Sequence, residues 1–245
     1  FVGDNRPNAM TNLYVAHNRV SYTGRNAIIA RDSDYAVYEY NTVAYSRRYS
    51  HGNSIFNFRT LCLVFQYNEA YGHTGEPDDI DRGGFDIAYN SRDTIVQYNY
   101  SHGNHWFLSV MKRPVANAIV RYNLSVNDRY GGYHYGFEKA DELTNLKVYN
   151  NTHYYGEGAK PEIIGPLLER SPMETVFNNN IFYAVNPGGS MGTNAENGVN
   201  VVYDTNVYIN ITPPESEANA LTADPLFVAA GAEPHDVDME NGRQV

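Results

Sequence analysis

Short apolar strands that end in asparagine recur along most of this chain. In each of them apolar residues come within a run of about five residues, and an Asn follows directly. Six repeats end at Asn18, Asn41, Asn68, Asn99, Asn123 and Asn150, and two looser ones end at Asn178–Asn179 and Asn206. The intervals between the first six asparagines lie between 23 and 31 residues. A repeat of this length is typical of a solenoid, in which each repeat forms one supersecondary unit.

Each repeat holds about three short strands separated by turns, and no segment has sustained helical periodicity. In residues 83–103, strands are expected over 85–89, 94–98 and 100–102. We therefore predict an all-β fold, a right-handed parallel β-helix of about seven to eight coils. Strands of successive coils stack about 4.8 Å apart, so one Asn per corner bonds its neighbours above and below as a ladder. Asn also tolerates the left-handed backbone of a sharp corner.

The repeats resemble those of a known superfamily. Residues 84–87 and 95–104 are close to a pattern common in right-handed parallel β-helix proteins of the pectate-lyase-like superfamily, and residues 223–228 resemble their closing segment. The resemblance covers roughly residues 12–228. It implies the fold and a carbohydrate ligand. It leaves the activity open, because this scaffold carries lyases, hydrolases, epimerases and non-catalytic surface proteins.

Two loops and two chain ends complete the expected organisation. We expect one β-helix domain over residues 1–228 and a polar tail over 229–245. Residue 1 lies close to what reads as an ongoing repeat, so the sequence is interpreted either as a mature form or as a fragment that lacks N-terminal coils. Residues 71–83 and 184–200 are read as inserted loops, and loops of a solenoid often lie on its binding face.

The composition argues against several classes of binding partner. The net charge of −10 and the pI near 5.2 argue against nucleic acid, which binds clustered Lys and Arg. No apolar run approaches the roughly 20 residues that a membrane span needs. The single cysteine, Cys62, is interpreted as a buried apolar side chain of a strand.

The first strands of four coils align in a way that predicts a polar row. If the pairs Phe56/Phe58, Phe85/Ile87, Leu108/Val110 and Tyr135/Phe137 point inward, alternation turns a polar residue next to each pair outward. These residues are Asn57, Asp86, Ser109 and Glu138. Asp86 and Glu138 would be about 10 Å apart at the backbone, and inverting glycosidases place two carboxyl groups roughly 6.5–9.5 Å apart. Asp81, in the preceding loop, is a third carboxylate. Polar residues also occupy such positions simply because water reaches them.

A lyase for uronic acid chains is the alternative chemistry. It needs a base, an acid and cations that neutralise the substrate carboxylate. The base would be His105 or His134, and the acid Tyr133 or Tyr135. The cations would be Lys112, Arg113 and Lys139, with Arg129 in the same region. His51 and His102 are set aside, because both belong to a repeated Ser-His-Gly-Asn motif that reads as a turn of the solenoid.

One loop could also bind a metal ion. Glu76, Asp78, Asp79 and Asp81 are hard oxygen ligands within six positions, which suits calcium. They do not follow EF-hand spacing, and a charged loop is often merely solvated. Neither candidate chemistry requires a cofactor.

The preferred interpretation is a secreted or periplasmic enzyme that degrades a polysaccharide. A glycoside hydrolase is favoured over a lyase, because the chain is acidic and lyases of polyuronates usually present a basic groove. A non-catalytic adhesin or carbohydrate-binding solenoid is the third class. The predicted catalytic residues are Asp86, Glu138, Asp81, His134 and His105, and the predicted substrate contacts are Asn57, Arg59, Trp106, Ser109, Lys112, Tyr133, Tyr135 and Lys139.

Overall fold

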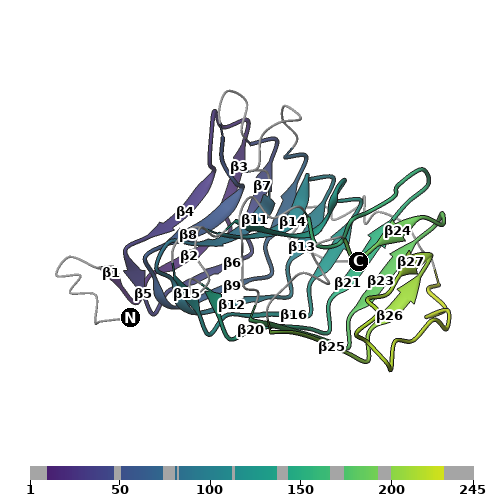
Figure 1. Ribbon diagram of the computed structural model, residues 1–245. Helices are drawn as coiled ribbons and strands as arrows, with labels where there is room; N and C mark the ends of the chain where they lie inside the picture. Colours follow the sequence, from purple (N-terminus) through teal and green to yellow (C-terminus); the bar gives the residue numbers. More distant parts are fainter. Residues whose placement is uncertain are drawn as a thin grey trace.

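The chain folds into a parallel β-solenoid of about six turns (Figure 1). The computed structural model describes residues 10–46, 51–73, 81, 83–111, 114–136, 143–165, 174–192 and 200–228. All the regular elements in these ranges are β-strands. The predicted fold class is confirmed, with slightly fewer turns than expected. The described residues contain no helix long and apolar enough to cross a membrane.

Three parallel sheets form the sides of the solenoid. Sheet A has twelve strands: β1 (Met10–Thr11), β2 (Tyr14–Ala16), β5 (Ser33–Asp34), β6 (Val37–Glu39), β9 (Leu61–Gln66), β12 (Arg92–Gln97), β15 (Val115–Ala116), β16 (Ile119–Arg121), β19 (Leu143–Thr144), β20 (Leu146–Tyr149), β22 (Thr175–Asn178) and β25 (Val201–Asp204). Sheet B has eight: β3 (Arg19–Ser21), β7 (Thr42–Ala44), β10 (Glu69–Tyr71), β13 (Tyr100–His102), β17 (Leu124–Val126), β21 (Thr152–Tyr155), β23 (Ile181–Ala184) and β26 (Val207–Ile209). Sheet C has five: β4 (Ile28–Arg31), β8 (Ile55–Phe58), β11 (Gly83–Ala88), β14 (Trp106–Met111) and β18 (Gly131–Gly136). A fourth sheet joins β24 (Gly189–Ser190) to β27 (Ile211–Thr212).

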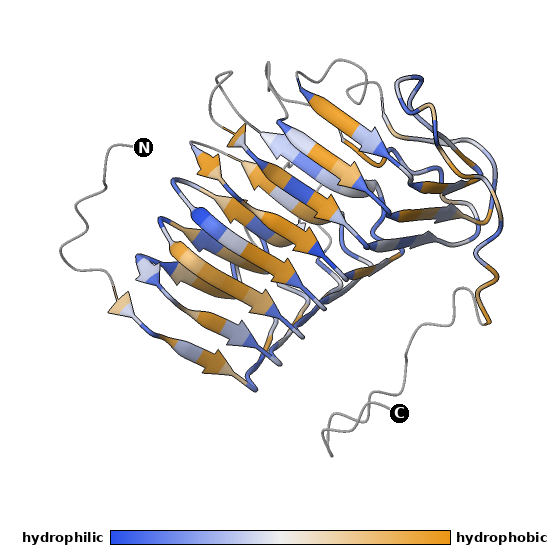
Figure 2. Ribbon diagram, turned by 90° about the horizontal axis from the view of Figure 1, so that it is seen from below, coloured by the Kyte–Doolittle hydropathy of each residue, from blue (hydrophilic) through white to orange (hydrophobic). Residues whose placement is uncertain are grey.

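One coil runs through sheet C, then sheet A, then sheet B. Apolar and polar positions alternate along many of the strands, which lie side by side in Figure 2. The inward side chains of the three sheets meet in one continuous core, whose largest fully buried members include Phe65, Phe85, Phe107, Phe177 and Phe182. Cys62 is half-buried and not fully buried as expected.

The predicted asparagine ladder is present at the corner between sheets A and B. Each member donates its backbone N–H and its Nδ2 to the Oδ1 of the next member, at 2.9–3.1 Å. The members are Asn18, Asn41, Asn68, Asn99, Asn123, Asn151, Asn180 and Asn206. The assignments of Asn150 and of Asn178–Asn179 were therefore wrong by one or two residues.

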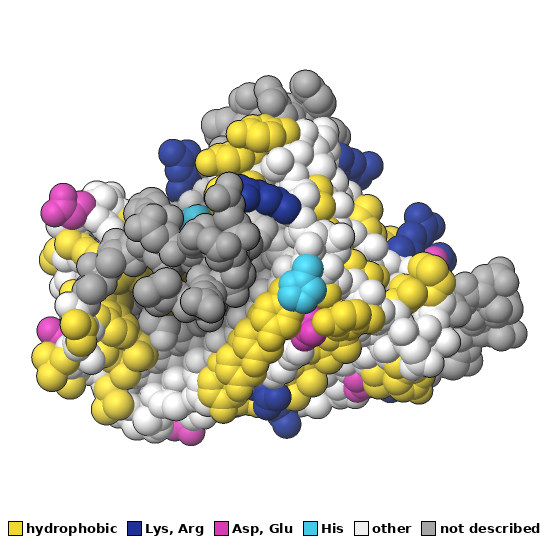
Figure 3. Space-filling view, turned by 180° about the vertical axis from the view of Figure 1, so that it is seen from behind, with side chains coloured by type: hydrophobic (Ala, Val, Ile, Leu, Met, Phe, Trp, Pro, Cys, Tyr) yellow, Lys and Arg dark blue, Asp and Glu magenta, His cyan; other side chains and the backbone are white. Residues whose placement is uncertain are grey.

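The left-handed position of this corner is the residue before the ladder asparagine. Its φ lies between 53° and 58° at all eight ladder positions. These residues are His17, Tyr40, Tyr67, Tyr98, Tyr122, Asn150, Asn179 and Thr205. The expectation that the ladder asparagines themselves take this conformation is therefore wrong. The side chains at the first five of these positions are aromatic, and their rings stack face to face with neighbouring centroids 5.1–5.2 Å apart. They form an exposed stripe along the solenoid (Figure 3).

Candidate active site

The outer face of sheet C carries a row of three polar side chains. Asp86, Ser109 and His134 are register partners in the successive strands β11, β14 and β18. Neighbouring strands lie about 4.8 Å apart, so the backbones of Asp86 and His134 are about 10 Å apart. All three side chains are buried, at 3%, 0% and 1% exposure. The row is therefore a sheltered polar surface and not a solvated face.

The Asp86 carboxylate is held by an asparagine of the preceding coil. Asn53 Nδ2 donates to Asp86 Oδ2 at 2.8 Å. Asn53 is itself fixed, because its N–H donates to Asn26 Oδ1 at 2.8 Å and its Oδ1 accepts the N–H of Gly83 at 2.7 Å. The orientation of the carboxylate is thus set by groups that are tied to the backbone of two coils.

Trp106 lies on the same face as this row. The alternation of inward and outward side chains is interrupted at the start of β14, because Phe107 and Leu108 both pack in the core. Trp106 and Ser109 therefore both face outward. The indole stacks on the His134 ring, with centroids 5.3 Å apart and planes 24° apart. A Cβ on Gly165 would lie 2.4 Å from the indole, so the glycine at this position makes room for the ring.

Two further aromatic side chains extend this group toward solvent. His105 packs edge-on against Trp106 at 5.1 Å and stacks on Tyr130 at 3.8 Å. His105 is buried, whereas Tyr130 is exposed. The four rings of His105, Trp106, Tyr130 and His134 therefore connect the buried row to the surface of the protein.

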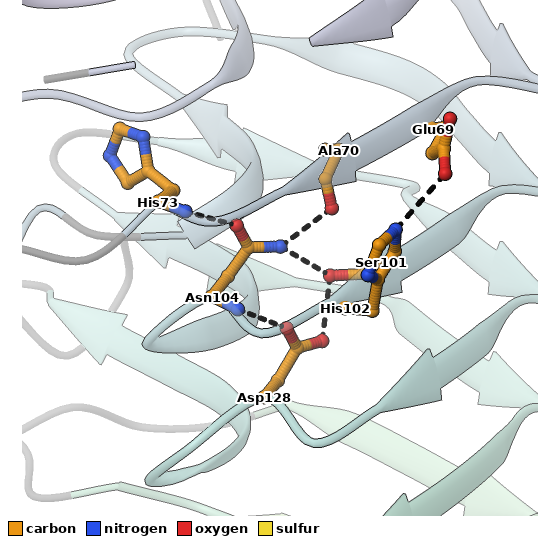
Figure 4. Close-up of polar contacts among 7 residues, drawn as sticks. All are labelled: Glu69, Ala70, His73, Ser101, His102, Asn104 and Asp128. Carbon is orange, nitrogen blue, oxygen red and sulfur yellow. Dashed lines mark hydrogen bonds and ion pairs between the residues drawn. The ribbon is translucent and has the colours of Figure 1, made fainter. Parts of the chain in front are cut away.

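A second buried corner, between sheets B and C, supports the start of β14. Asp128 accepts hydrogen bonds from Ser101 Oγ at 2.6 Å and from the N–H of Asn104 at 2.9 Å (Figure 4). It also accepts one from Ser125 Oγ at 2.8 Å. Asn104 Oδ1 in turn accepts the N–H of His73 at 2.9 Å. Burial raises the pKa of the Asp128 carboxyl.

These corner residues were not predicted as part of the site. The repeated Ser-His-Gly-Asn motif was their only signal, and its interpretation as a turn agrees with the buried positions of Asn53 and Asn104. The histidine of its second copy, His102, hydrogen-bonds Glu69 with its Nε2 3.0 Å from Oε1, and its ring stacks on Tyr71. What the motif did not reveal is that Asn53 reaches Asp86 across 33 positions of sequence.

Three predicted substrate contacts lie in the core. Asn57 was expected to face outward, but it is fully buried and donates to Thr60 Oγ1 and Thr94 Oγ1 at 2.9 and 3.0 Å. Tyr133 and Tyr135 are also fully buried, and burial raises the pKa of both phenols. Tyr133 Oη lies 3.0 Å from Nε2 of the core residue His153. A sugar that lies on the outer face of sheet C does not reach these three side chains.

The register also corrects the predicted partner of Asp86. The residue two coils from Asp86 in the row is His134, four positions before Glu138. Glu138, Lys112, Arg113, Lys139 and the loop residues Glu76, Asp78 and Asp79 lie outside the described residues. Arg59 is at the corner after β8, where its guanidinium pairs with Asp32 at 2.6 Å.

Asp81 is placed beside the strand that carries Asp86. Its carbonyl oxygen accepts the N–H of Gly52 at 3.4 Å, so it occupies the corner that leads into β11. It is half-buried. Among the described residues no three His, Cys, Asp or Glu side chains gather as metal ligands would, and calcium binding by the 71–83 loop stays a prediction.

Comparison with known proteins yields one informative relative. No protein-family model matches the chain. The chain is 33% identical over 243 residues to a lacto-N-biosidase of Bifidobacterium longum subsp. longum, a glycoside hydrolase. The match covers 91% of this chain and 14% of the relative, so the chain spans a small part of that protein's length.

Proposed function

We propose that this chain carries the active site of a glycoside hydrolase, with Asp86 as one of two catalytic carboxylates. The observation that carries the proposal is the Asp86 carboxylate itself, sheltered on the outer face of sheet C and oriented by Asn53. The similarity to a lacto-N-biosidase supports hydrolysis of a glycosidic bond as the reaction. The substrate would be an oligosaccharide or polysaccharide.

Glycosidases use one carboxyl group as an acid and a second carboxylate as a base or nucleophile. An amide donor such as Asn53 Nδ2 stabilises the ionised form of the carboxylate that it contacts. This contact suits Asp86 to the role of base or nucleophile. Asp81 is the described carboxyl group closest to it along the chain, and we propose Asp81 as the acid, with Glu138 as the other candidate.

The solenoid architecture and the repeat pattern of residues 84–87 and 95–104 support membership of the pectate-lyase-like superfamily. Within that superfamily the lyase chemistry receives less support. Tyr133 and Tyr135 lie on the core side of β18, whereas His134 faces outward, so neither tyrosine meets His134 as an acid–base pair. A polysaccharide substrate also favours a secreted or periplasmic location.

The direct test is hydrolysis by the wild type and by Asp86→Asn. The chain is incubated with an aryl lacto-N-bioside and with neutral and uronic acid polysaccharides, and new reducing ends and unsaturated uronic ends are measured. We expect reducing ends without unsaturation, and a loss of about 10²–10⁴-fold in Asp86→Asn. Glu157→Gln, which changes an exposed carboxylate, is the matched control and should keep full activity.

Two results would contradict the proposal. Unsaturated ends would establish a lyase. Full activity of Asp86→Asn, with an unchanged fold by circular dichroism, would remove Asp86 from the mechanism. Saccharide binding without any product would favour the non-catalytic binding module.

A further inference from the structure

Two buried polar atoms beside Asp86 have no hydrogen-bond partner among the described residues. They are Ser109 Oγ and Trp106 Nε1, and neither has a partner within the described part of the chain. Their side chains are 0% and 5% exposed. Buried donors are expensive to leave unpaired, so native proteins rarely leave them without a partner. Both atoms belong to the strand next to Asp86, since Ser109 is its register partner and Trp106 pairs with Gly83.

Gly83 places no side chain against the Ser109 hydroxyl. A Cβ on Gly83 would lie 2.9 Å from Ser109 Oγ and 3.2 Å from Asn53 Oδ1. Any other residue at this position would therefore crowd both the serine and the asparagine that holds Asp86. Gly83, the unpaired Ser109 hydroxyl and the oriented Asp86 carboxylate therefore lie together on sheet C.

We infer that Ser109 Oγ and Trp106 Nε1 hydrogen-bond the saccharide unit that lies against Asp86. The inference rests on the proposed function for the class of ligand. The indole N–H can only donate, whereas a serine hydroxyl both donates and accepts, so sugar hydroxyl groups satisfy both atoms. A uronic acid unit would bring a second negative charge next to Asp86, which disfavours it. The unit bound here is therefore a neutral sugar.

Ser109→Ala and Trp106→Phe remove the two polar atoms, and Trp106→Phe keeps an aromatic ring at its position. Each variant should raise KM about three- to tenfold for a neutral oligosaccharide, the loss expected for one hydrogen bond. Ser109→Ala should also unfold at an equal or higher urea concentration, because it removes an unpaired buried hydroxyl. Lower affinity with equal or higher stability is the combination that a purely structural serine would not produce.

Tyr155→Phe is the matched control. Tyr155 Oη is likewise buried and lacks a hydrogen-bond partner among the described residues, but the side chain lies in the core. This variant should gain stability in the same way as Ser109→Ala and keep the wild-type KM. A rise of KM in Tyr155→Phe equal to that in Ser109→Ala would overturn the inference, because it would make the effect nonspecific.

The only tryptophan of the chain makes binding visible without turnover. Fluorescence of Trp106 is titrated with the aryl lacto-N-bioside, and with neutral and uronic oligosaccharides, in the Asp86→Asn background. We expect a saturable change with a neutral ligand, at an affinity three- to tenfold lower when Ser109→Ala is added.

The outcomes separate this inference from the proposed function. Hydrolysis by the wild type without a fluorescence change in Asp86→Asn, or with unchanged KM in both Ser109→Ala and Trp106→Phe, overturns the subsite and leaves the hydrolase. Such a result would indicate that an internal water satisfies both atoms. A fluorescence change that depends on Ser109, without hydrolysis, overturns the hydrolase and supports the subsite. If the protein neither hydrolyses nor binds any of these saccharides, both the subsite and the hydrolase are overturned.

Discussion

At the residue scale, the buried carboxylate of Asp128 occupies the corner position that Asn104 occupies in the neighbouring coil. Asp128 accepts the N–H of Asn104 in the same way as Asn104 Oδ1 accepts the N–H of His73. Burial raises its pKa above the ordinary value of 3.8, while hydrogen bonds from Ser101 and Ser125 oppose that rise. The folded protein therefore holds the Asp128 proton more tightly than the unfolded chain does.

This difference predicts the pH dependence of Asp128→Asn. Where the folded state binds more protons, the free energy of unfolding falls as pH rises. Wild-type stability should thus decline between pH 3.8 and the raised pKa of Asp128. The asparagine variant lacks this decline, so its stability relative to the wild type should increase from acidic pH toward neutrality. Urea unfolding at a series of pH values measures the difference.

Asp204→Asn is a control of opposite sign. Hydrogen bonds led by Asn219 lower the pKa of this exposed carboxyl. Its contribution to stability is therefore present above the ordinary pKa and is lost as pH falls. The prediction fails if the difference in free energy of unfolding between Asp128→Asn and the wild type does not change with pH. It also fails if that difference follows the trend of Asp204→Asn.

At the element scale, the exposed aromatic stripe balances backbone strain against ring stacking. Tyr67 has a φ of 54° and stacks on Tyr40 and Tyr98 at 5.1 and 5.2 Å. A left-handed conformation costs a bulky residue about 1–2 kcal/mol, and each stacked pair contributes about 0.5–1.5 kcal/mol. The two terms are of similar size. Asn150 and Asn179 occupy the same corner position in later coils without any stack.

We therefore expect Tyr67→Asn to change the free energy of unfolding by no more than about 1 kcal/mol, because relief of strain offsets the lost stacking. Tyr67→Ala loses the same stacking and keeps the strain, so it should be less stable than Tyr67→Asn by about 1 kcal/mol. Urea unfolding of both variants measures this. Equal stability of the two would mean that the left-handed backbone is not strained at this corner.

The sequence repeat predicted where strands form. It was harder to predict which side chains of each strand face the core. Phe56 and Phe58 resembled the inward pair of β8, yet Ile55 and Asn57 point inward instead. A shift of one residue moves every side chain to the other face. The sequence could not reveal it, because the buried Asn57 is compensated by threonine hydroxyls of its own and the following coil.

The polar row was predicted in part for the same reason. Asp86 and Ser109 were aligned correctly, because both strands have an unambiguous apolar residue on each side. In β18 the predicted row position was wrong by four residues, which keeps the face but moves the position along the strand by about 13 Å. His134 therefore takes the place that Glu138 was expected to fill.

At the scale of the whole molecule, the two ends of the solenoid differ. At the first described coil, β1, β2 and β3 each pair with one neighbour only, and the ladder begins at the exposed Asn18. At the last coil, Leu221 pairs with Val207 and bonds the backbone of Asn206. Repeat proteins gain stability mainly from contacts between neighbouring coils. The first described coil should therefore exchange its amide hydrogens faster than the last one.

Glu217 is the residue that closes the ladder. Its Oε1 accepts the N–H and the Nδ2 of Asn206 at 2.8 and 3.1 Å, as the next asparagine would, and its Oε2 accepts Tyr208 Oη at 2.6 Å. The three donors belong to buried residues, and each unpaired donor costs about 1–3 kcal/mol. Glu217→Ala should therefore reduce hydrogen-exchange protection of the Asn206 and Tyr208 amides by about 3 kcal/mol.

The loss should stay local to the end of the solenoid. Because stability is transmitted from coil to coil, amides of central coils such as Asn99 should keep their protection when the last coil opens. Glu217→Gln keeps the accepting oxygen for Asn206 and should recover part of the protection. Asn18→Ala, at the opposite end, should leave the last coil unchanged. An equal loss at Asn99 and Asn206 in Glu217→Ala would instead show that the solenoid opens as one cooperative unit, and that its ends are not separately stabilised.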